Sequence, residues 1–444
     1  MSDWRGEALH LARSGGTLAV NQLLQLAVPF ITTAMTGRLG VEALAAGSIV
    51  GSIGLLLFIT SLGAMQGLIP PLSGSLGAGD HHVAARTIRG GLLIAVAMGL
   101  AATAIMAGVP RGLAAAGLDP ALVTGAGCYI DGLLPGYLPS IVLIAFRFFL
   151  IAANDLRWLN AIVIATTAFN AALNLGLAGG RFGLDGMTAI GLTVALTQWL
   201  GLGLLLLATA RSKRLPKDVR DRRAGFALRD ALRLGIPVGA VFFTEALLFT
   251  GSNVLMGYVG PVETAAHGIV LLWLNVALMV PVGLSQAAMA RVASLLGQRD
   301  RDAMRQAVRV ALVAGATAST IVGILLAAGS DSLVHLTLWS RSAASEDVVA
   351  VARDFFRFCA VTQLLSGLVI VMASILRGLR DANAVLWLVM LGYWGVGLGS
   401  AVLLAFVLGL GGRGIWIGIT LAFAFAVTLL ALRFRRALYG GAPR

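Results

Sequence analysis

Residues 211–233, RSKRLPKDVRDRRAGFALRDALR, form the only long polar stretch in this chain of 444 residues. On both sides of it the sequence is a succession of apolar runs of about 20 residues, the length that an α-helix needs to cross about 30 Å of hydrocarbon. Between residues 17 and 434 there are twelve such runs, six before the polar stretch and six after it. The stretch therefore indicates a linker between two six-helix halves.

The composition agrees with a chain that lies mostly in lipid. Hydrophobic residues make up 58% of the sequence and charged residues 12%, whereas about a quarter of an ordinary globular sequence is charged. Strands of a membrane barrel would alternate over about ten residues, and the sequence lacks that pattern. We therefore predict an all-α polytopic membrane protein with twelve transmembrane helices, arranged as two pseudo-symmetric six-helix lobes.

The apolar runs divide the chain into five expected segments. They are a cytoplasmic N-terminus (1–16), an N-terminal lobe (17–209), a cytoplasmic linker (210–235), a C-terminal lobe (236–434) and a basic cytoplasmic tail (435–444).

The net charge of +13 is distributed by membrane side. If the N-terminus is cytoplasmic, 26 of the 33 Lys and Arg residues fall on the cytoplasmic side and 7 on the other. This asymmetry is what the positive-inside rule predicts. We therefore expect a multi-pass membrane protein with both termini in the cytoplasm, and no nucleic-acid partner.

The two halves contain an internal repeat. Shifting the sequence by 220 residues gives 13 identities over positions 37–92, among them Gly37 with Gly257, Gln66 with Gln286 and Asp80 with Asp300. Both members of each pair fall on the same side of the membrane, so the repeat is parallel. Duplicated bundles of this kind, with a site between the repeats, are the architecture of secondary transporters.

Glu245 is the strongest candidate for a functional residue. It lies near the middle of the run GIPVGAVFFTEALLFTGSNVLMG (235–257), with no Lys or Arg between Arg233 and Arg291. A carboxylate at mid-membrane costs roughly 2.5–3.5 kcal/mol on insertion scales. We expect Glu245 to bind a proton or a cation; a neutral, hydrogen-bonded Glu with a structural role is the alternative.

Other polar residues within the runs are weaker candidates. Gln25 is the repeat partner of Glu245, and Pro29 frees the carbonyl of residue 25 and predicts a kink. Asn170 and Asn174 share a helix face and suit either a cavity or interhelical contacts. Asp131 is a secondary candidate for binding the coupling ion. Asp131 and Arg147 lie toward opposite ends of the same apolar run. The remaining candidates for a substrate cavity are Thr32, Asn253, Asn275, Gln286 and Ser366.

Signals of an enzyme are absent from the sequence, which has no Walker A motif, HExxH motif or nucleophile elbow. Transport without an ATPase motif requires an ion gradient. We therefore expect a protein that is not an enzyme, that needs no cofactor and that binds no metal other than a coupling cation at Glu245.

Several segments resemble the multidrug and toxic compound extrusion (MATE) family, closest to its NorM-like branch. In the N-terminal half they are MTGRLGVEALAAGSIV (35–50), GLIPPLSGSLGAGD (67–80) and NAALNLGLAGGRFGLDGMTAIG (170–191). In the C-terminal half they are LMGYVGPVETAAHGIV (255–270), VPVGLSQAAMARVASLLGQRD (280–300), SILRGLRDANAVLWLVMLGYWGVGLG (374–399) and GGRGIWIG (411–418). Together they cover nearly the whole chain, in the order of the family.

The resemblance implies two lobes in a V around a central cavity, and export of small organic, often cationic and amphipathic compounds by antiport with Na⁺ or H⁺. The glutamate of helix 7 in the family corresponds to Glu245, and the asparagines of helix 5 to Asn170 and Asn174. The aspartates of helices 1 and 10 fall at Thr32 and Ser366, so two of the three acids of the family are replaced here.

Two alternatives remain. A flippase of the wider superfamily would carry a lipid-linked or anionic substrate and would need a basic cavity, but no mid-span Arg or Lys is evident in the sequence. A non-transporting accessory membrane protein would tolerate Glu245→Gln. The partners that we expect are small organic substrates and the lipid bilayer, and we expect a monomer.

Overall fold

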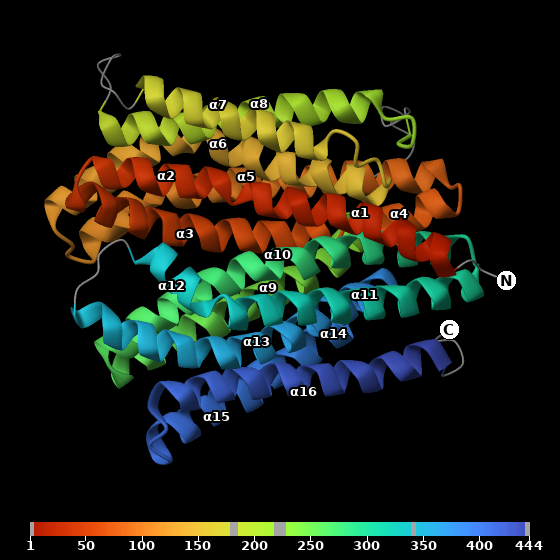
Figure 1. Cartoon of the computed structure of the whole chain (residues 1–444). Coiled ribbons are helices and arrows are strands. Elements are labelled where there is room, and N and C mark those ends of the chain that lie inside the picture. Colours follow the sequence, from red (N-terminus) through yellow and green to blue (C-terminus); the bar gives the residue numbers. More distant parts are fainter. Residues whose placement is uncertain (1–3, 178–184, 217–227, 339–342, 440–444) are drawn as a thin grey trace. The chain divides into compact units, whose positions relative to one another are not determined.

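The computed structural model describes residues 4–177, 185–216, 228–338 and 343–439, which form helices joined by short turns (Figure 1). Within these ranges twelve helical segments are long and apolar enough to cross a membrane, and strands are absent. The predicted all-α class and the number of spans are confirmed. Residues 217–227 of the predicted linker and 440–444 of the predicted tail lie outside the described residues.

The helices follow the two halves of the sequence. Those before the linker are α1 (Trp4–Gln25), α2 (Ala27–Arg38), α3 (Val41–Gln66), α4 (Ile69–Gly77), α5 (His81–Ala115), α6 (Pro120–Ala152), α7 (Leu159–Leu177) and α8 (Gly186–Arg211). Those after it are α9 (Leu228–Val259), α10 (Pro261–Gly297), α11 (Arg301–Ala328), α12 (Ser330–Thr337), α13 (Ala343–Gly378), α14 (Ala382–Met390), α15 (Gly399–Val402) and α16 (Gly411–Tyr439). Two π-helical segments, η2 (Leu391–Leu398) and η3 (Leu403–Val407), flank α15.

The chain packs into two compact units whose borders lie inside helices. The N-terminal unit is Val20–Gly239, and the C-terminal unit combines Met1–Ala19 with Ala240–Arg444. Both α1 and α9 therefore begin in one unit and end in the other. The two crossing points, after Ala19 and after Gly239, are related by the 220-residue shift of the repeat.

Close contacts of glycines with neighbouring helices occur at positions that are related by the same 220-residue shift. In the C-terminal unit a Cβ atom on Gly15 would lie 2.5 Å from Leu284 Cδ1. In the N-terminal unit a Cβ on Gly235 would lie 2.8 Å from the carbonyl oxygen of Ala64. Gly15 and Gly235, like Ala64 and Leu284, are repeat partners, so the duplication predicted from sequence extends to the contacts between helices.

Four tight turns have one design, in which a residue with positive φ precedes an aspartate. The turns are Gly79–Asp80, Asn154–Asp155, Arg299–Asp300 and Arg380–Asp381. Asp80 and Asp300 cap the helices that follow by accepting hydrogen bonds from Val83 N and Ala303 N. The repeat thus preserves the turn geometry even where glycine is replaced by arginine.

Asp155 and Asp381 instead tie their turns to the last helix of their unit. Asp155 is buried and accepts hydrogen bonds from Ser212 Oγ (2.7 Å) and Arg157 Nε (2.9 Å). Asp381 accepts a hydrogen bond from Arg433 Nε at 2.7 Å. Each aspartate therefore fixes the turn after the most buried span of its half, α6 or α13, to the end of α8 or α16.

The Asp155 anchor predicts acid sensitivity. The hydrogen bond from Arg157, against the desolvation of the buried carboxyl, holds the pKa of Asp155 below its ordinary value. Because a depressed folded-state pKa stabilises the fold only above the unfolded value of about 3.9, this contribution is lost as the pH falls through the folded-state pKa. Thermal unfolding should therefore show Asp155→Asn less stable than wild type at pH 6, with a gap that shrinks toward pH 3. A gap that is constant with pH would contradict the assignment.

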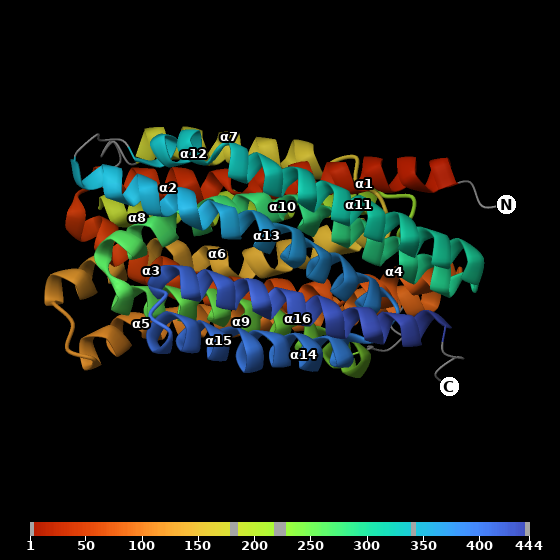
Figure 2. The same ribbon diagram turned by 60° about the horizontal axis from the view of Figure 1, so that its bottom comes forward.

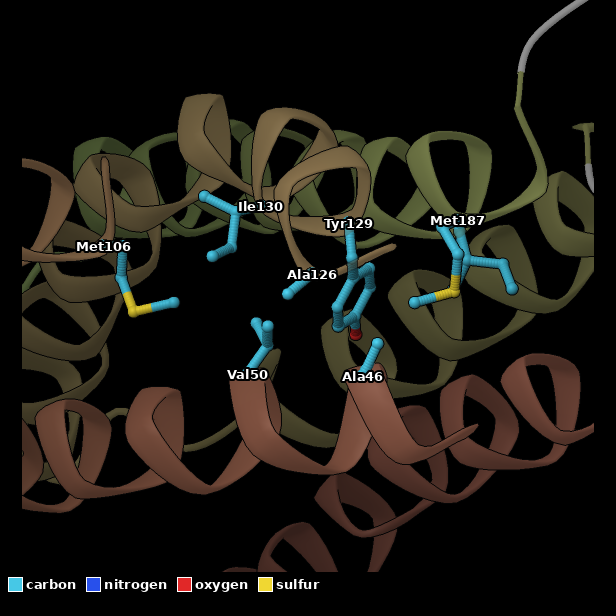
Figure 3. Close-up of a cluster of buried hydrophobic side chains, with 8 residues drawn as sticks. Ala46, Val50, Met106, Ala126, Tyr129, Ile130 and Met187 are labelled. Atoms are coloured by element: carbon cyan, nitrogen blue, oxygen red, sulfur yellow. The ribbon is translucent and has the colours of Figure 1, made fainter. Parts of the chain in front are cut away.

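The core of the N-terminal unit lies between α3, α5, α6 and α8. Figure 3 shows Val50, Met106 and Tyr129 converging there with other buried apolar side chains. The backbones of α6 and α8 approach so closely that a Cβ on Gly132 would overlap the carbonyl oxygen of Thr188. Small residues at such crossings are how membrane helices gain packing energy.

In the C-terminal unit α13 is the central helix. It packs against α10, α11 and α16 and runs alongside α16 in Figure 2. The helix that follows contains the two π-helical segments, which recur at functional sites in helical proteins. Tyr393 lies in the first of them and is buried.

Candidate functional site: a buried polar cluster in each unit

The C-terminal unit holds Glu245 opposite a buried arginine. Glu245 is half-buried near the middle of α9. Its carboxylate attracts the guanidinium of Arg377, which lies one residue before the end of α13 and is 5% exposed. Among the described residues no hydrogen bond or ion pair within 4.0 Å joins the two, so the attraction acts across a gap. We call Glu245, Arg377 and their neighbours the Glu245 cluster.

Two aromatic rings complete this cluster. The guanidinium carbon of Arg377 lies 5.6 Å from the centroid of Phe242, one helical turn before Glu245, which is within the range of a cation–π contact. Tyr393 of η2 packs edge-to-face on Phe423, with the two ring centroids 5.0 Å apart. Arg377 Nε has no hydrogen-bond partner. The arginine is therefore held by packing and by charge rather than by a fixed network.

The N-terminal unit holds a matching cluster without an acid. Gln25 Oε1 accepts a hydrogen bond from Arg147 Nη1 at 2.7 Å, and Gln22 Oε1 accepts one from Arg147 Nη2. Arg147 belongs to α6 and is 4% exposed. When the turns at Asp155 and Asp381 are aligned, Arg147 falls one helical turn before the position of Arg377, on the same helix face.

These two arginines add to the sequence interpretation. That interpretation places Arg147 toward one end of its run and notes that no Arg or Lys lies mid-span, and both arginines do lie near helix ends. The structure shows in addition that both are buried and contact helices α1 and α9. One feature of the sequence could have indicated these arginines. Each of them lies in the same half as one member of the polar repeat pair Gln25 and Glu245.

The helix is interrupted beside Gln25, where the sequence predicts a kink. Helix α1 ends at Gln25 and α2 begins at Ala27, three residues before Phe30, whose N–H bonds to the carbonyl of Leu26. Pro29 cannot donate to the carbonyl of Gln25, so the helix is interrupted there. The break frees backbone polar groups next to the Gln25 amide.

Asn170 and Asn174 join helices within the N-terminal unit. Both are buried. Asn170 Nδ2 donates to Thr197 Oγ1 of α8 at 3.1 Å, and Asn174 Nδ2 donates to Asn170 Oδ1 at 3.1 Å. This is the interhelical arrangement that the sequence leaves open beside substrate binding. Asn174 Oδ1 has no protein partner, so an acceptor remains available.

The other candidates divide by burial. Thr32, Gln286 and Ser366 are buried, and Thr32 Oγ1 and Gln286 Oε1 lack partners. The repeat partner of Gln286, Gln66, is likewise buried with an unpaired Oε1. Asn253 and Asn275 are exposed and donate to the carbonyl one turn earlier in their own helices. Asp131 is exposed on α6, away from the Arg147 contacts.

A transition-metal or multi-carboxylate centre does not form in the part of the chain that the structure describes. No group of three or more His, Cys, Asp or Glu side chains comes together among those residues. The chemistry of the two clusters is therefore that of single charges and amides.

Comparison with known proteins gives a consistent result. The sequence matches the MatE family over residues 18–175 and 237–403. The "Probable multidrug resistance protein NorM" of Agrobacterium fabrum is 32% identical over 93% of this chain and 90% of its own. The protein of the same name from Bradyrhizobium diazoefficiens is 32% identical over 97% and 93%.

Solved structures share the fold. A MATE transporter of Vibrio cholerae superposes with a TM-score of 0.89 at 16% identity, covering 99% of this chain and 98% of its own. A eukaryotic MATE transporter gives 0.84 at 22% identity, covering 97% and 96%. The twelve spans, the internal repeat and the family match agree, and the chain belongs to the MatE family of membrane transporters, in its NorM-like branch.

Proposed function

We propose that this protein is a secondary active antiporter that exports small organic compounds, often cationic and amphipathic, in exchange for Na⁺ or H⁺. The observation that carries the proposal is Glu245, a half-buried carboxylate in the middle of a membrane-spanning helix that faces a buried arginine without bonding to it. The curated relatives are named as multidrug resistance proteins, which supports the substrate class. The polar side chains described above would line the path.

Glu245 suits ion exchange because of what surrounds it. A carboxylate that was permanently bonded to a neighbour could not release a proton or a cation, whereas Glu245 makes no hydrogen bond among the described residues. Its side chain is partly exposed, so the protein does not enclose it completely. When the bound ion leaves, Arg377 balances the remaining charge. Cation and substrate would then compete for the same carboxylate.

The proposed setting is a bacterial inner membrane with both termini in the cytoplasm and a single chain as the working unit. The distribution of 26 and 7 basic residues supports this orientation. It follows that the linker and the turns at Asp155 and Asp381 face the cytoplasm. Small organic molecules and lipids are the proposed partners, with no nucleic acid and no cofactor.

Reconstituted vesicles test the proposal. Efflux of a cationic dye should follow an imposed pH gradient or an imposed Na⁺ gradient, and Glu245→Gln should reduce it to the rate of empty vesicles. The gradient that drives efflux identifies the ion. Glu42→Gln is the matched control, because Glu42 is an exposed acid in the first turn of α3. Coupled efflux that survives in Glu245→Gln would remove this residue from the mechanism.

A carrier of anionic or lipid-linked substrates is the second candidate, and one observation favours it. The sequence argument against it rests on the absence of a mid-span Arg or Lys. Arg147 and Arg377 lie near the ends of their helices, but both are buried and supply positive charge inside the protein. Efflux of an anionic dye with no response to cationic dyes would select this alternative.

A further inference from the structure

Four residues of the N-terminal unit form one hydrogen-bonded group, which we call the Arg147 cluster. Gln22 and Gln25 of α1 accept the hydrogen bonds from Arg147, and Gln25 Nε2 donates to Asn21 Oδ1 at 2.7 Å. Asn21, Gln22 and Arg147 are 0%, 7% and 4% exposed. The cluster therefore consists of three neutral amide side chains that are hydrogen-bonded around one buried cation, all within the N-terminal unit.

The charge of this cluster is not balanced by the protein. An arginine stays protonated in proteins, and burying a charge is costly unless it is paired. Within the described ranges no Asp or Glu forms a hydrogen bond or an ion pair with Arg147, whose side-chain hydrogen bonds go to Gln22 and Gln25. Arg377 has Glu245 in the other unit, whereas the repeat partner of Glu245 is the neutral Gln25.

The cluster also has more donors than acceptors. Arg147 Nε and Asn21 Nδ2 are both buried and both lack a hydrogen-bond partner. The two glutamine oxygens are already used by the arginine, and the Asn21 oxygen by Gln25. Buried polar groups are nearly always paired, so the two free donors leave a place for a further acceptor. The adjacent guanidinium favours an acceptor that carries negative charge.

We propose that the Arg147 cluster binds one small anionic group, a carboxylate or a phosphate. The planar guanidinium matches the two oxygens of such a group, and Asn21 Nδ2 supplies a further donor. The anion is either free in solution or carried as the carboxylate of a transported molecule. The binding site itself does not depend on transport, so its failure and the failure of the proposed antiport are separate results.

The first test uses free anions and the full chain in detergent. Acetate and phosphate are titrated as sodium salts against a bulky sulfonate buffer anion, at constant Na⁺ and ionic strength, while the unfolding temperature is measured. At least one of the two should raise it saturably, because a ligand that binds only the folded state stabilises it. A wild-type protein that shows no saturable rise with either anion would overturn the proposal.

Two variants and a matched control locate the site. Arg147→Gln should weaken the anion affinity by about 10- to 100-fold, the size expected for losing a charge-assisted hydrogen bond. Asn21→Leu keeps the charge and removes one donor, so it should weaken affinity less, and it serves if the first variant does not fold. Arg377→Gln removes the other buried arginine and should leave the affinity unchanged. A response lost in Arg377→Gln and kept in Arg147→Gln would refute the assignment.

The second test distinguishes the source of the anion and rests on the proposed function. Vesicles are loaded with a rhodamine that has a free carboxyl group or with its ethyl ester, in which an ethyl group replaces the negative charge. Selective loss of the acid in Arg147→Gln, with the ester still exported, assigns the site to the carboxylate of a transported molecule. Equal export of both dyes, together with a lost acetate response, assigns it to a free anion.

Discussion

The double variant Glu245→Gln/Arg377→Gln is expected to unfold close to the wild-type temperature while showing no coupled transport. Glu245→Gln alone should be the less stable protein, because it leaves Arg377 buried with no opposing charge. Breaking a buried charge pair from one side costs about 3–5 kcal/mol. Glu245 is half-buried and does not touch the arginine, so we expect about 1–3 kcal/mol for this pair.

The measurement combines thermal unfolding in detergent with efflux from vesicles for the wild type, both single variants and the double variant. A double-mutant cycle isolates the coupling between the two charges. Recovery of stability without recovery of transport separates the role of Glu245 in ion exchange from its role in balancing Arg377. If the double variant were less stable than either single variant, the two charges would not be a pair. This cycle also guards the vesicle test against mistaking a misfolded Glu245→Gln protein for an uncoupled one.

The sequence predicts the architecture because the bilayer imposes simple rules on it. Span length, hydropathy and the 220-residue repeat follow from covalent geometry and duplication, and the structure places the unit borders at Ala19 and Gly239 in agreement with that repeat. Glu245 can also be identified from the sequence alone, since it is a single acidic residue within an apolar run. The repeat even predicts that Gln25 matters, and Gln25 contacts Arg147.

The buried arginines could not be predicted in the same way. Each lies within a few residues of a helix end, where basic residues usually reach water or headgroups. Whether Arg147 turns inward depends on which face of α6 packs against α1, and a single sequence does not determine that pairing. The same limit applies to Asn170, whose partner Thr197 lies on a different helix. A single sequence thus predicts where a residue lies along its helix, but it does not predict which residues of other helices that residue contacts.

The crossing of α1 and α10 within the C-terminal unit should respond strongly to a single side chain added at a glycine. A Cβ on Gly283 would overlap the backbone nitrogen of Ala19 and lie 2.5 Å from its Cα. Backbone atoms in two packed helices cannot move aside as a side chain can, so Gly283→Val should cost at least about 3 kcal/mol. Thermal unfolding and the yield of monodisperse protein measure the effect.

Two controls show that packing, and not the change of residue type or the nearby ion pair, determines the result. Gly268 lies in the same helix, and a Cβ on it would meet no atom within 4 Å, so Gly268→Val should change stability by less than about 1 kcal/mol. Glu7 of α1 bonds Arg291 of α10 at 2.8 Å, and Glu7→Gln should cost no more than about 1 kcal/mol because the pair is partly exposed. If Glu7→Gln proved as damaging as Gly283→Val, charge rather than close backbone packing would hold the first helix to this unit.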